Sequence, residues 1–216
     1  MPFSLEMLLN YFAIYNDRIW PAQWAGFALG LVALLPLFRT GRVWSRVVTG
    51  TLAFLWLWIG LVFWVGAARQ MAVLYAPAAL FVAEAALCLY ALYREHVLYD
   101  SVGGAWVITG CIFIAYALVG YPLVGLMVGH EYPQAAISPL FPCPAIVLTF
   151  GVFLLARRVP WYLLVIPTFW ALSGILWFSL GMVEDVGLVI AGVVGVVMLI
   201  ARERISRRTV ASTQKP

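Results

Sequence analysis

One acidic residue, Glu84, lies in the middle of a long apolar segment, thirteen residues after Met71 and nine before Tyr93. A charge at the centre of a bilayer costs at least about 2.5–3.5 kcal/mol on insertion scales, so ionisable residues there are rare and usually functional. None of the apolar segments carries a basic residue to neutralise it. We therefore expect Glu84 to be protonated, or hydrogen-bonded to Tyr, Trp, Thr or Ser of a facing helix. Such a carboxyl can couple the movement of protons to the movement of a solute. Alternatively, it only holds neighbouring helices together.

A second group of polar and reactive side chains falls between or at the ends of the apolar segments. We expect it to form an outer vestibule of His130, Glu131, Tyr132, Cys143, Glu184 and Asp185. Imidazole, carboxylate and thiol groups can bind zinc or copper, so His130, Glu131 and Cys143 are candidate metal ligands. Their spacing matches no metal motif, and no particular cofactor is indicated. Glu184 and Asp185 also precede an apolar helix, where capping and the helix dipole alone explain acidic residues.

Cys143 stands between Pro142 and Pro144, in the predicted first turn of a helix. The positive end of a helix dipole makes a thiol more reactive. A free cysteine also commonly serves as a small apolar filler. A ligand, a redox-active thiol and a filler therefore remain alternatives.

Aromatic side chains are numerous, with ten Trp and ten Tyr. The tryptophans near segment ends suit an interfacial belt: Trp20, Trp44, Trp64, Trp106 and Trp161. Deeper ones could bind a ligand by stacking or cation–π contact: Trp56, Trp58, Trp170 and Trp177.

The elements that must position these residues are transmembrane helices. Of 216 residues, 65% are hydrophobic and 10% charged, whereas a soluble domain is roughly a quarter charged. Apolar runs near the length of about 20 residues needed for a span occur at 22–38, 47–68, 71–93, 104–128, 139–156, 161–181 and 186–201. The prediction is an all-α, seven-helix transmembrane bundle forming one membrane domain, 1–216. Residues 4–20 carry apolar side chains at helical spacing and predict a short interfacial helix.

Basic residues set the predicted orientation, because cytoplasmic loops retain Lys and Arg. Eleven fall on one side: Arg39, Arg42, Arg46, Arg94, Arg157, Arg158, Arg202, Arg204, Arg207, Arg208 and Lys215. Only Arg18 and Arg69 fall on the other. The N-terminus is therefore predicted outside and the C-terminus in the cytoplasm. The positive net charge reflects topology and does not indicate nucleic-acid binding.

Two further patterns bear on architecture. The segments around Leu35–Trp64 and Leu154–Phe178 echo each other weakly, which predicts two parallel three-helix repeats joined by a linker helix, as in some transporters. Gly187, Ala191, Gly192 and Gly195 give the seventh span a small-residue face. Such faces pack helices closely, and a homo-oligomer could form through this one.

Two short motifs carry a family resemblance: Tyr15-Asn16-Asp17-Arg18-Ile19-Trp20-Pro21-Ala22-Gln23, and His130-Glu131-Tyr132-Pro133 followed by Pro142-Cys143-Pro144. With these motifs the chain resembles a bacterial polytopic membrane-protein family known as a domain of unknown function. The resemblance implies a multi-pass protein of the bacterial inner membrane and contributes no activity.

Three functions stay open. The first is a small-solute or ion transporter in which Glu84 couples or binds; the second is a metal-binding, redox or sensing protein acting through the outer residues. The third is an accessory subunit of a membrane complex. An enzyme is less expected, because no phosphate-binding glycine loop or nucleophile elbow is present. The only lysine is Lys215, so no helix lysine can hold retinal.

Overall fold

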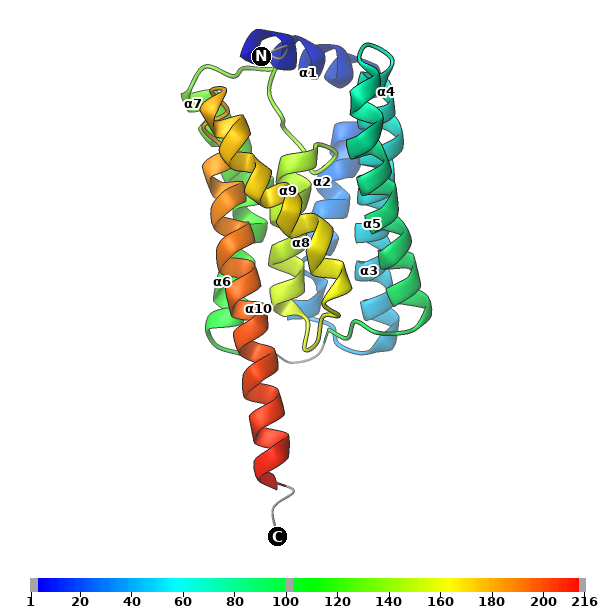
Figure 1. Cartoon of the computed structure of the whole chain (residues 1–216), viewed down its shortest axis with the longest axis vertical. Coiled ribbons are helices and arrows are strands. Elements are labelled where there is room, and N and C mark those ends of the chain that lie inside the picture. Colours follow the sequence, from blue (N-terminus) through cyan, green and yellow to red (C-terminus); the bar gives the residue numbers. More distant parts are fainter. Residues whose placement is uncertain (1–3, 100–102, 214–216) are drawn as a thin grey trace.

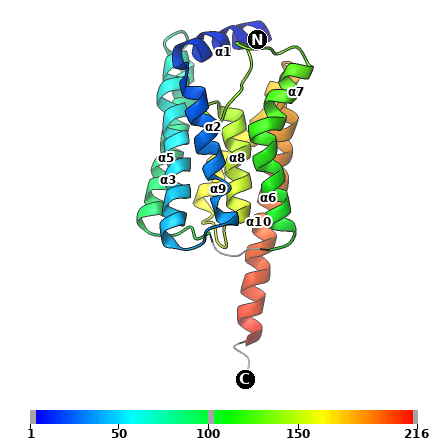
Figure 2. The same cartoon turned by 180° about the vertical axis from the view of Figure 1, so that it is seen from behind.

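The chain forms an upright bundle of helices with one further helix lying across its end (Figures 1 and 2). The computed structural model describes residues 4–99 and 103–213, with side chains through Ser206. The α-helices are α1 (Leu5–Ile19), α2 (Ala22–Val32), α3 (Arg42–Trp58), α4 (Val65–Ala68), α5 (Tyr75–Tyr93), α6 (Ala105–Ala115), α7 (Tyr121–Met127), α8 (Pro142–Leu155), α9 (Tyr162–Ser179) and α10 (Asp185–Thr213). Short 3₁₀ turns lie at Leu35–Leu37 and Ala72–Leu74, and π-helical stretches at Ile59–Trp64 and Tyr116–Gly120.

Helix α1 is the element that lies across the bundle. It meets the following helical segment, Ala22–Leu37, at 93°. Ser4 caps its start by accepting a hydrogen bond from the Met7 amide, and Leu8, Phe12, Tyr15 and Ile19 are buried against the bundle. This is the position expected of an amphipathic helix at a membrane surface.

Helix α8 is the central element of the bundle. All its residues from Pro144 to Leu155 are buried, and it packs against α6, α9 and α10. An ideal Cβ on Gly110 of α6 would lie 2.8 Å from the Gly151 carbonyl oxygen of α8. Only glycine at both positions allows these two backbones to approach so closely.

Within the described residues, five helical segments are long and apolar enough to cross a membrane: Arg42–Ala68, Ala72–Tyr93, Ala105–Met127, Tyr162–Ser179 and Asp185–Ser206. A sixth is added if α1 and the bent segment after it form one broken span. Helix α8, with 14 residues, is about 21 Å long at 1.5 Å per residue, less than the roughly 30 Å hydrocarbon core. The all-α membrane fold is confirmed, whereas seven spans, their orientation and the internal repeat stay predictions.

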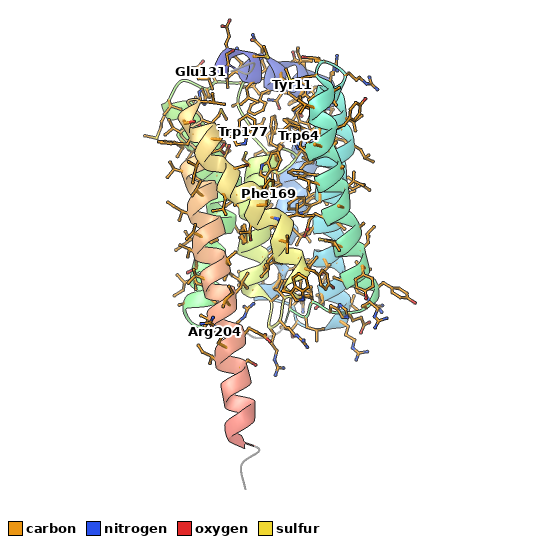
Figure 3. The ribbon with its side chains drawn as sticks, viewed as in Figure 1. Tyr11, Trp64, Glu131, Phe169, Trp177 and Arg204 are labelled. Atoms are coloured by element: carbon orange, nitrogen blue, oxygen red, sulfur yellow. The ribbon has the colours of Figure 1, made fainter. Side chains whose placement is uncertain are left out.

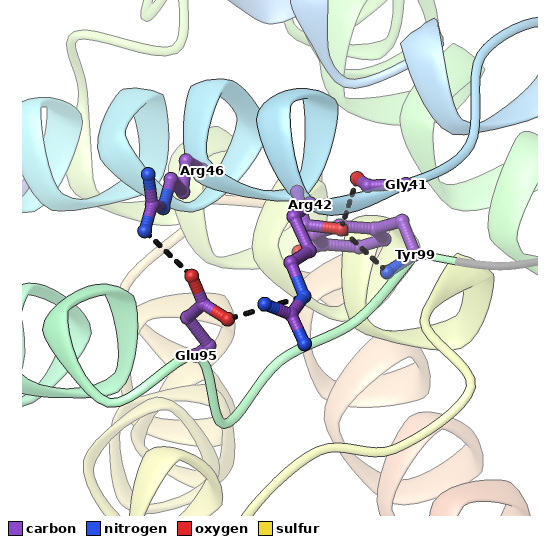
Figure 4. Close-up of polar contacts among 6 residues, drawn as sticks. Gly41, Arg42, Arg46, Glu95 and Tyr99 are labelled. Carbon is purple, nitrogen blue, oxygen red and sulfur yellow. Dashed lines mark hydrogen bonds and ion pairs between the residues drawn. The ribbon is translucent and has the colours of Figure 1, made fainter.

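The two ends of the bundle differ in charge. We call the end covered by α1 the α1 end and the opposite one the basic end. At the basic end Glu95 pairs with Arg42 and Arg46 of α3 (Figure 4). Beside them Ser45 donates to the Gly41 carbonyl and accepts from the Tyr99 amide. Burial raises the pKa of the Tyr99 hydroxyl above its usual value. Of the predicted cytoplasmic residues, Lys215 lies outside the described part of the chain.

The small-residue face of α10 is used inside the chain. An ideal Cβ on Gly187 would lie 2.1 Å from Cε1 of Tyr116, and one on Gly192 2.4 Å from Cβ of Ala171. An ideal Cβ on Gly195 would lie 2.8 Å from Cδ1 of Phe150. This face is therefore not free for a second subunit. A homo-oligomer through α10 would have to use its exposed side, formed by Val186, Ile190, Val193 and Val197.

Candidate functional site

A cavity lies beneath α1, at the α1 end of the bundle. The space measures about 350 Å³ with open solvent included, and about 20 Å³ of it can be occupied by the centre of a water molecule. The closed cavity therefore has room for about one water. It is lined by Leu8, Phe12, Phe63, Trp64, Tyr121, Ala136, Phe141, Pro142, Cys143, Pro144, Trp170, Trp177, Met182 and Asp185. Figure 3 shows Trp64 and Trp177 on opposite sides of this region, with α1 across the top. The wall is almost wholly apolar and aromatic, as small-molecule pockets usually are.

Two π-helical stretches shape the cavity. The stretch Ile59–Trp64 ends with Phe63 and Trp64, and the stretch Tyr116–Gly120 ends immediately before Tyr121; all three side chains line the cavity. A π-helical turn rotates the residues that follow it relative to an α-helix. Such stretches frequently occur at functional sites.

The one acidic side chain of the lining is Asp185, at the start of α10. Its Oδ1 accepts a 2.6 Å hydrogen bond from the Tyr121 hydroxyl, and Cys143 Sγ lies 3.6 Å from Oδ2. Asp185 is 1% exposed. The Asp185 carboxyl thus contacts a hydroxyl of α7 and a thiol of α8 at one wall of the apolar cavity.

Glu184 and His130 form a second polar pair next to this wall. Glu184 Oε1 lies 3.0 Å from His130 Nδ1, and both side chains are buried. Glu184 Oε2 has no hydrogen-bond partner among the described residues. The sequence allowed Glu184 and Asp185 to be simple helix caps, but their carboxyls bond to side chains of other elements.

The segment Tyr15–Gln23, the first of the two family motifs, holds α1 in place above the cavity by hydrogen bonds. Asn16 donates from Nδ2 to the carbonyls of Pro133 (2.7 Å) and Ala135 (2.8 Å), and Gln23 donates to the Asn16 backbone and side-chain oxygens. Tyr15 donates to the Leu140 carbonyl and accepts from Trp58 Nε1. The two motifs, more than a hundred residues apart in the chain, therefore fasten α1 to the loop before α8.

An aromatic layer forms the floor. The rings of Trp64 and Trp170 meet edge to face at 5.2 Å, and Phe81 of α5 lies 5.0 Å from Trp170. The indole N–H groups of Trp64 and Trp170 have no hydrogen-bond partner among the described residues. Both N–H groups are buried, and the surface of the cavity is apolar.

Glu84 lies three residues beyond Phe81 on α5, on the side of the aromatic layer away from the cavity, and is fully buried. Its only hydrogen-bond contact among the described residues is with the Cys88 thiol of its own helix, 3.9 Å from Oε1. Oε2 has no partner there. The expected Tyr, Trp, Thr or Ser on a facing helix does not supply one.

Not all sequence-selected residues lie in one site. Trp170, Trp177, Cys143 and Asp185 line the cavity, with His130 and Glu184 behind its wall. Glu131 and Tyr132 are exposed. Trp56 is fully buried and donates from Nε1 to Thr149, so it is a packed core residue. Glu84 is not part of the lining.

The proposed metal ligands do not converge. No group of three His, Cys, Asp or Glu side chains in residues 4–99 and 103–206 could hold a metal ion. His130 pairs with Glu184 and Cys143 with Asp185, while Glu131 points to the surface side of the loop. A three-ligand site of His130, Glu131 and Cys143 is therefore not formed in this structure.

Sequence reasoning missed two site residues. Trp64 was assigned to an interfacial belt because it stands near a segment end, yet it is 5% exposed and faces the cavity. Tyr121 gave no signal, because a tyrosine near a helix end is ordinary in a membrane protein. The helix breakers around it, Gly120 and Pro122, were the available clue to irregular backbone.

Comparison with known proteins identifies a family for this chain. A family model described as a family of unknown function (DUF6064) matches residues 5–210. No curated protein and no solved structure matches the chain.

Proposed function

We propose that this chain, which belongs to the family of unknown function DUF6064, is a transporter of the bacterial inner membrane that moves a small aromatic or organic-cation solute, with Glu84 carrying the coupled proton. The observation that carries the proposal is the Glu84 carboxyl. It is fully buried, has an unpartnered oxygen, and lies one helical turn beyond the floor of a cavity.

The chemistry of the cavity wall supports this class of solute, although the cavity must widen to admit it. Its lining includes three tryptophans, Trp64, Trp170 and Trp177, and a single carboxyl, Asp185. Aromatic faces attract organic cations, especially where water is excluded, and a nearby carboxylate adds to the attraction.

The aromatic layer supplies a gate in this proposal. Phe81, Trp64 and Trp170 separate the cavity from Glu84. A transporter must keep its site closed on at least one side at any time, so a closed layer is the arrangement expected of a resting state. The π-helical stretch that carries Trp64 is where α3 and α4 would adjust their pairing with α5.

Few titratable side chains lie close enough to Glu84 to interact with its charge. Cys88 on α5 and Tyr162 on α9 are the titratable side chains that feel its charge. The α3 and π-helical segments that pack against α5 contribute Thr49 and Trp56 to the buried interior, neither of which titrates. The cavity wall carries further titratable groups, Asp185 with the Glu184–His130 pair behind it. The pH dependence of transport is therefore assigned to Glu84 by the Glu84→Gln variant.

The test uses the full chain in vesicles and radiolabelled benzyltrimethylammonium, an aromatic cation that does not cross lipid unaided. We expect uptake by the natural chain to change with external pH and to collapse when the pH gradient is removed. Glu84→Gln keeps the shape but cannot release a proton, so its uptake should be independent of pH.

Glu131→Gln is the matched control, because it makes the same change at an exposed carboxyl of the α1 end. It should behave like the natural chain. Uptake no faster than in protein-free vesicles would contradict the solute class, and pH-dependent uptake by Glu84→Gln would contradict the role of that residue.

A further inference from the structure

A second hollow lies at the basic end, where α10 leaves the bundle. It is a groove of about 660 Å³ between the loop that joins α8 to α9 and the α10 residues from Leu199 to Arg204. Figure 3 shows Arg204 at the point where α10 passes the lower edge of the other helices. The groove lies far from the cavity under α1 and shares no lining residue with it.

Positive charge dominates the groove. Four arginines line it, against two acidic residues, Glu95 and Glu203. Glu95 is already paired with Arg42 and Arg46. Arg158 and Arg204 are exposed and form an ion pair with no acidic side chain among the residues whose side chains are described.

Arg202 supports the groove from behind. Its guanidinium donates to the carbonyls of Leu154 (3.0 Å) and Phe153 (3.2 Å) in the last turn of α8. It thereby satisfies carbonyls that a helix end leaves open and ties α10 to the central helix. The N–H groups of Arg202 are used in these hydrogen bonds, but its positive charge still lies in the groove.

The groove is also partly apolar. Leu164 of α9 and Ile200 of α10 line it, and Trp161, which is 76% exposed, stands at its rim. Exposed tryptophan beside arginine is typical of the level where a membrane meets water. A site for a soluble phosphate would not need this apolar wall.

We infer that this groove binds the phosphate headgroup of an anionic phospholipid, with Arg158 and Arg204 on the phosphate and the acyl chains along Leu164 and Ile200. The planar guanidinium binds phosphate oxygens in a two-pronged manner, which favours arginine at such a site. Basic pockets between transmembrane helices on the cytoplasmic side are known to hold anionic headgroups.

The experiment measures lipid retained by the purified full chain in mild detergent, by native mass spectrometry, with phosphatidylglycerol and phosphatidylcholine added at equal concentration. We expect phosphatidylglycerol to be retained over phosphatidylcholine. The double variant Arg158→Gln, Arg204→Gln should bind it roughly 25-fold more weakly, since each arginine near an anionic headgroup contributes about fivefold. Arg204→Gln alone should give about a fivefold loss.

The matched control is the double variant Arg39→Gln, Arg94→Gln, which removes the same charge from exposed positions of the same end, outside the groove. It should retain the lipid as the natural chain does. An equal loss in the control would show only general charge attraction and overturn the site. Equal retention of phosphatidylcholine, or displacement of the lipid by millimolar inorganic phosphate, would also overturn it.

Discussion

Glu84 and Thr149 are two buried polar side chains whose hydrogen bonds differ. Thr149 donates to the Ala145 carbonyl (2.8 Å) and accepts from Trp56 Nε1 (3.1 Å), so its hydroxyl is fully used. Glu84 has one long contact to a thiol and an unpartnered oxygen. A buried polar group without a partner costs stability, whereas a satisfied one does not. A residue that only held helices together would resemble Thr149.

This contrast predicts opposite effects on stability. Glu84→Met keeps the length of the side chain and removes the unsatisfied oxygen, so it should stabilise the bundle by about 1–2 kcal/mol. Thr149→Val leaves the Trp56 N–H without a partner and should destabilise it by about the same amount. Thermal unfolding in detergent, followed by tryptophan fluorescence, measures both. Destabilisation by Glu84→Met would mean that the carboxyl acts as a structural bond.

At the scale of elements, α10 and the π-helical stretch Tyr116–Gly120 depend on each other. The Tyr116 ring packs on Gly187, and its hydroxyl donates to the Glu184 carbonyl (2.7 Å) just before α10 begins. This contact sets where α10 starts, and so where Glu184 and Asp185 meet His130 and Tyr121. A glycine on α10 thus positions the acidic wall of the cavity.

Glycine substitutions test this packing. Gly187→Ala places a methyl group 2.1 Å from Cε1 of Tyr116, so a side chain must shift. It should lower the free energy of unfolding by about 1–3 kcal/mol. Gly50→Ala in α3 is the matched control, because its Cβ would meet only Leu92 Cδ1 at 3.4 Å. It should be neutral or stabilising by up to about 1 kcal/mol through helix propensity. Equal effects of the two substitutions in detergent unfolding would argue against the close α10 contact.

At the scale of the whole molecule, charge separates the two ends. The connections at the basic end carry Arg39, Arg94, Arg157 and Arg158, while Glu131 lies in the loop at the α1 end. Since basic loops stay in the cytoplasm, the α1 end and the cavity should face outward. Helix α8 must then cross despite its 14 residues. Its burial on all sides makes this feasible, because the surrounding helices, not lipid, contact it.

Reporter fusions test that orientation. Alkaline phosphatase is active only outside the cytoplasm. It should therefore be active when fused after Gln134, in the loop before α8, and inactive when fused after Pro160, in the loop after α8. A fluorescent protein after Pro216 should fluoresce, as expected in the cytoplasm. Phosphatase activity at both Gln134 and Pro160 would show that α8 does not cross.

Local properties of the chain were sufficient to predict the membrane helices, the crosswise α1, the basic end and the buried Glu84. Hydropathy, helical spacing and the distribution of arginines are properties of short segments. The expected membership of a family of unknown function is confirmed by a family model that matches residues 5–210. Packing alone decided the rest. His130 meets Glu184 and Tyr121 meets Asp185 across more than fifty residues, and Trp64 turns inward. These contacts depend on how helices cross and on the rotation that a π-helical turn introduces, neither of which a single segment encodes.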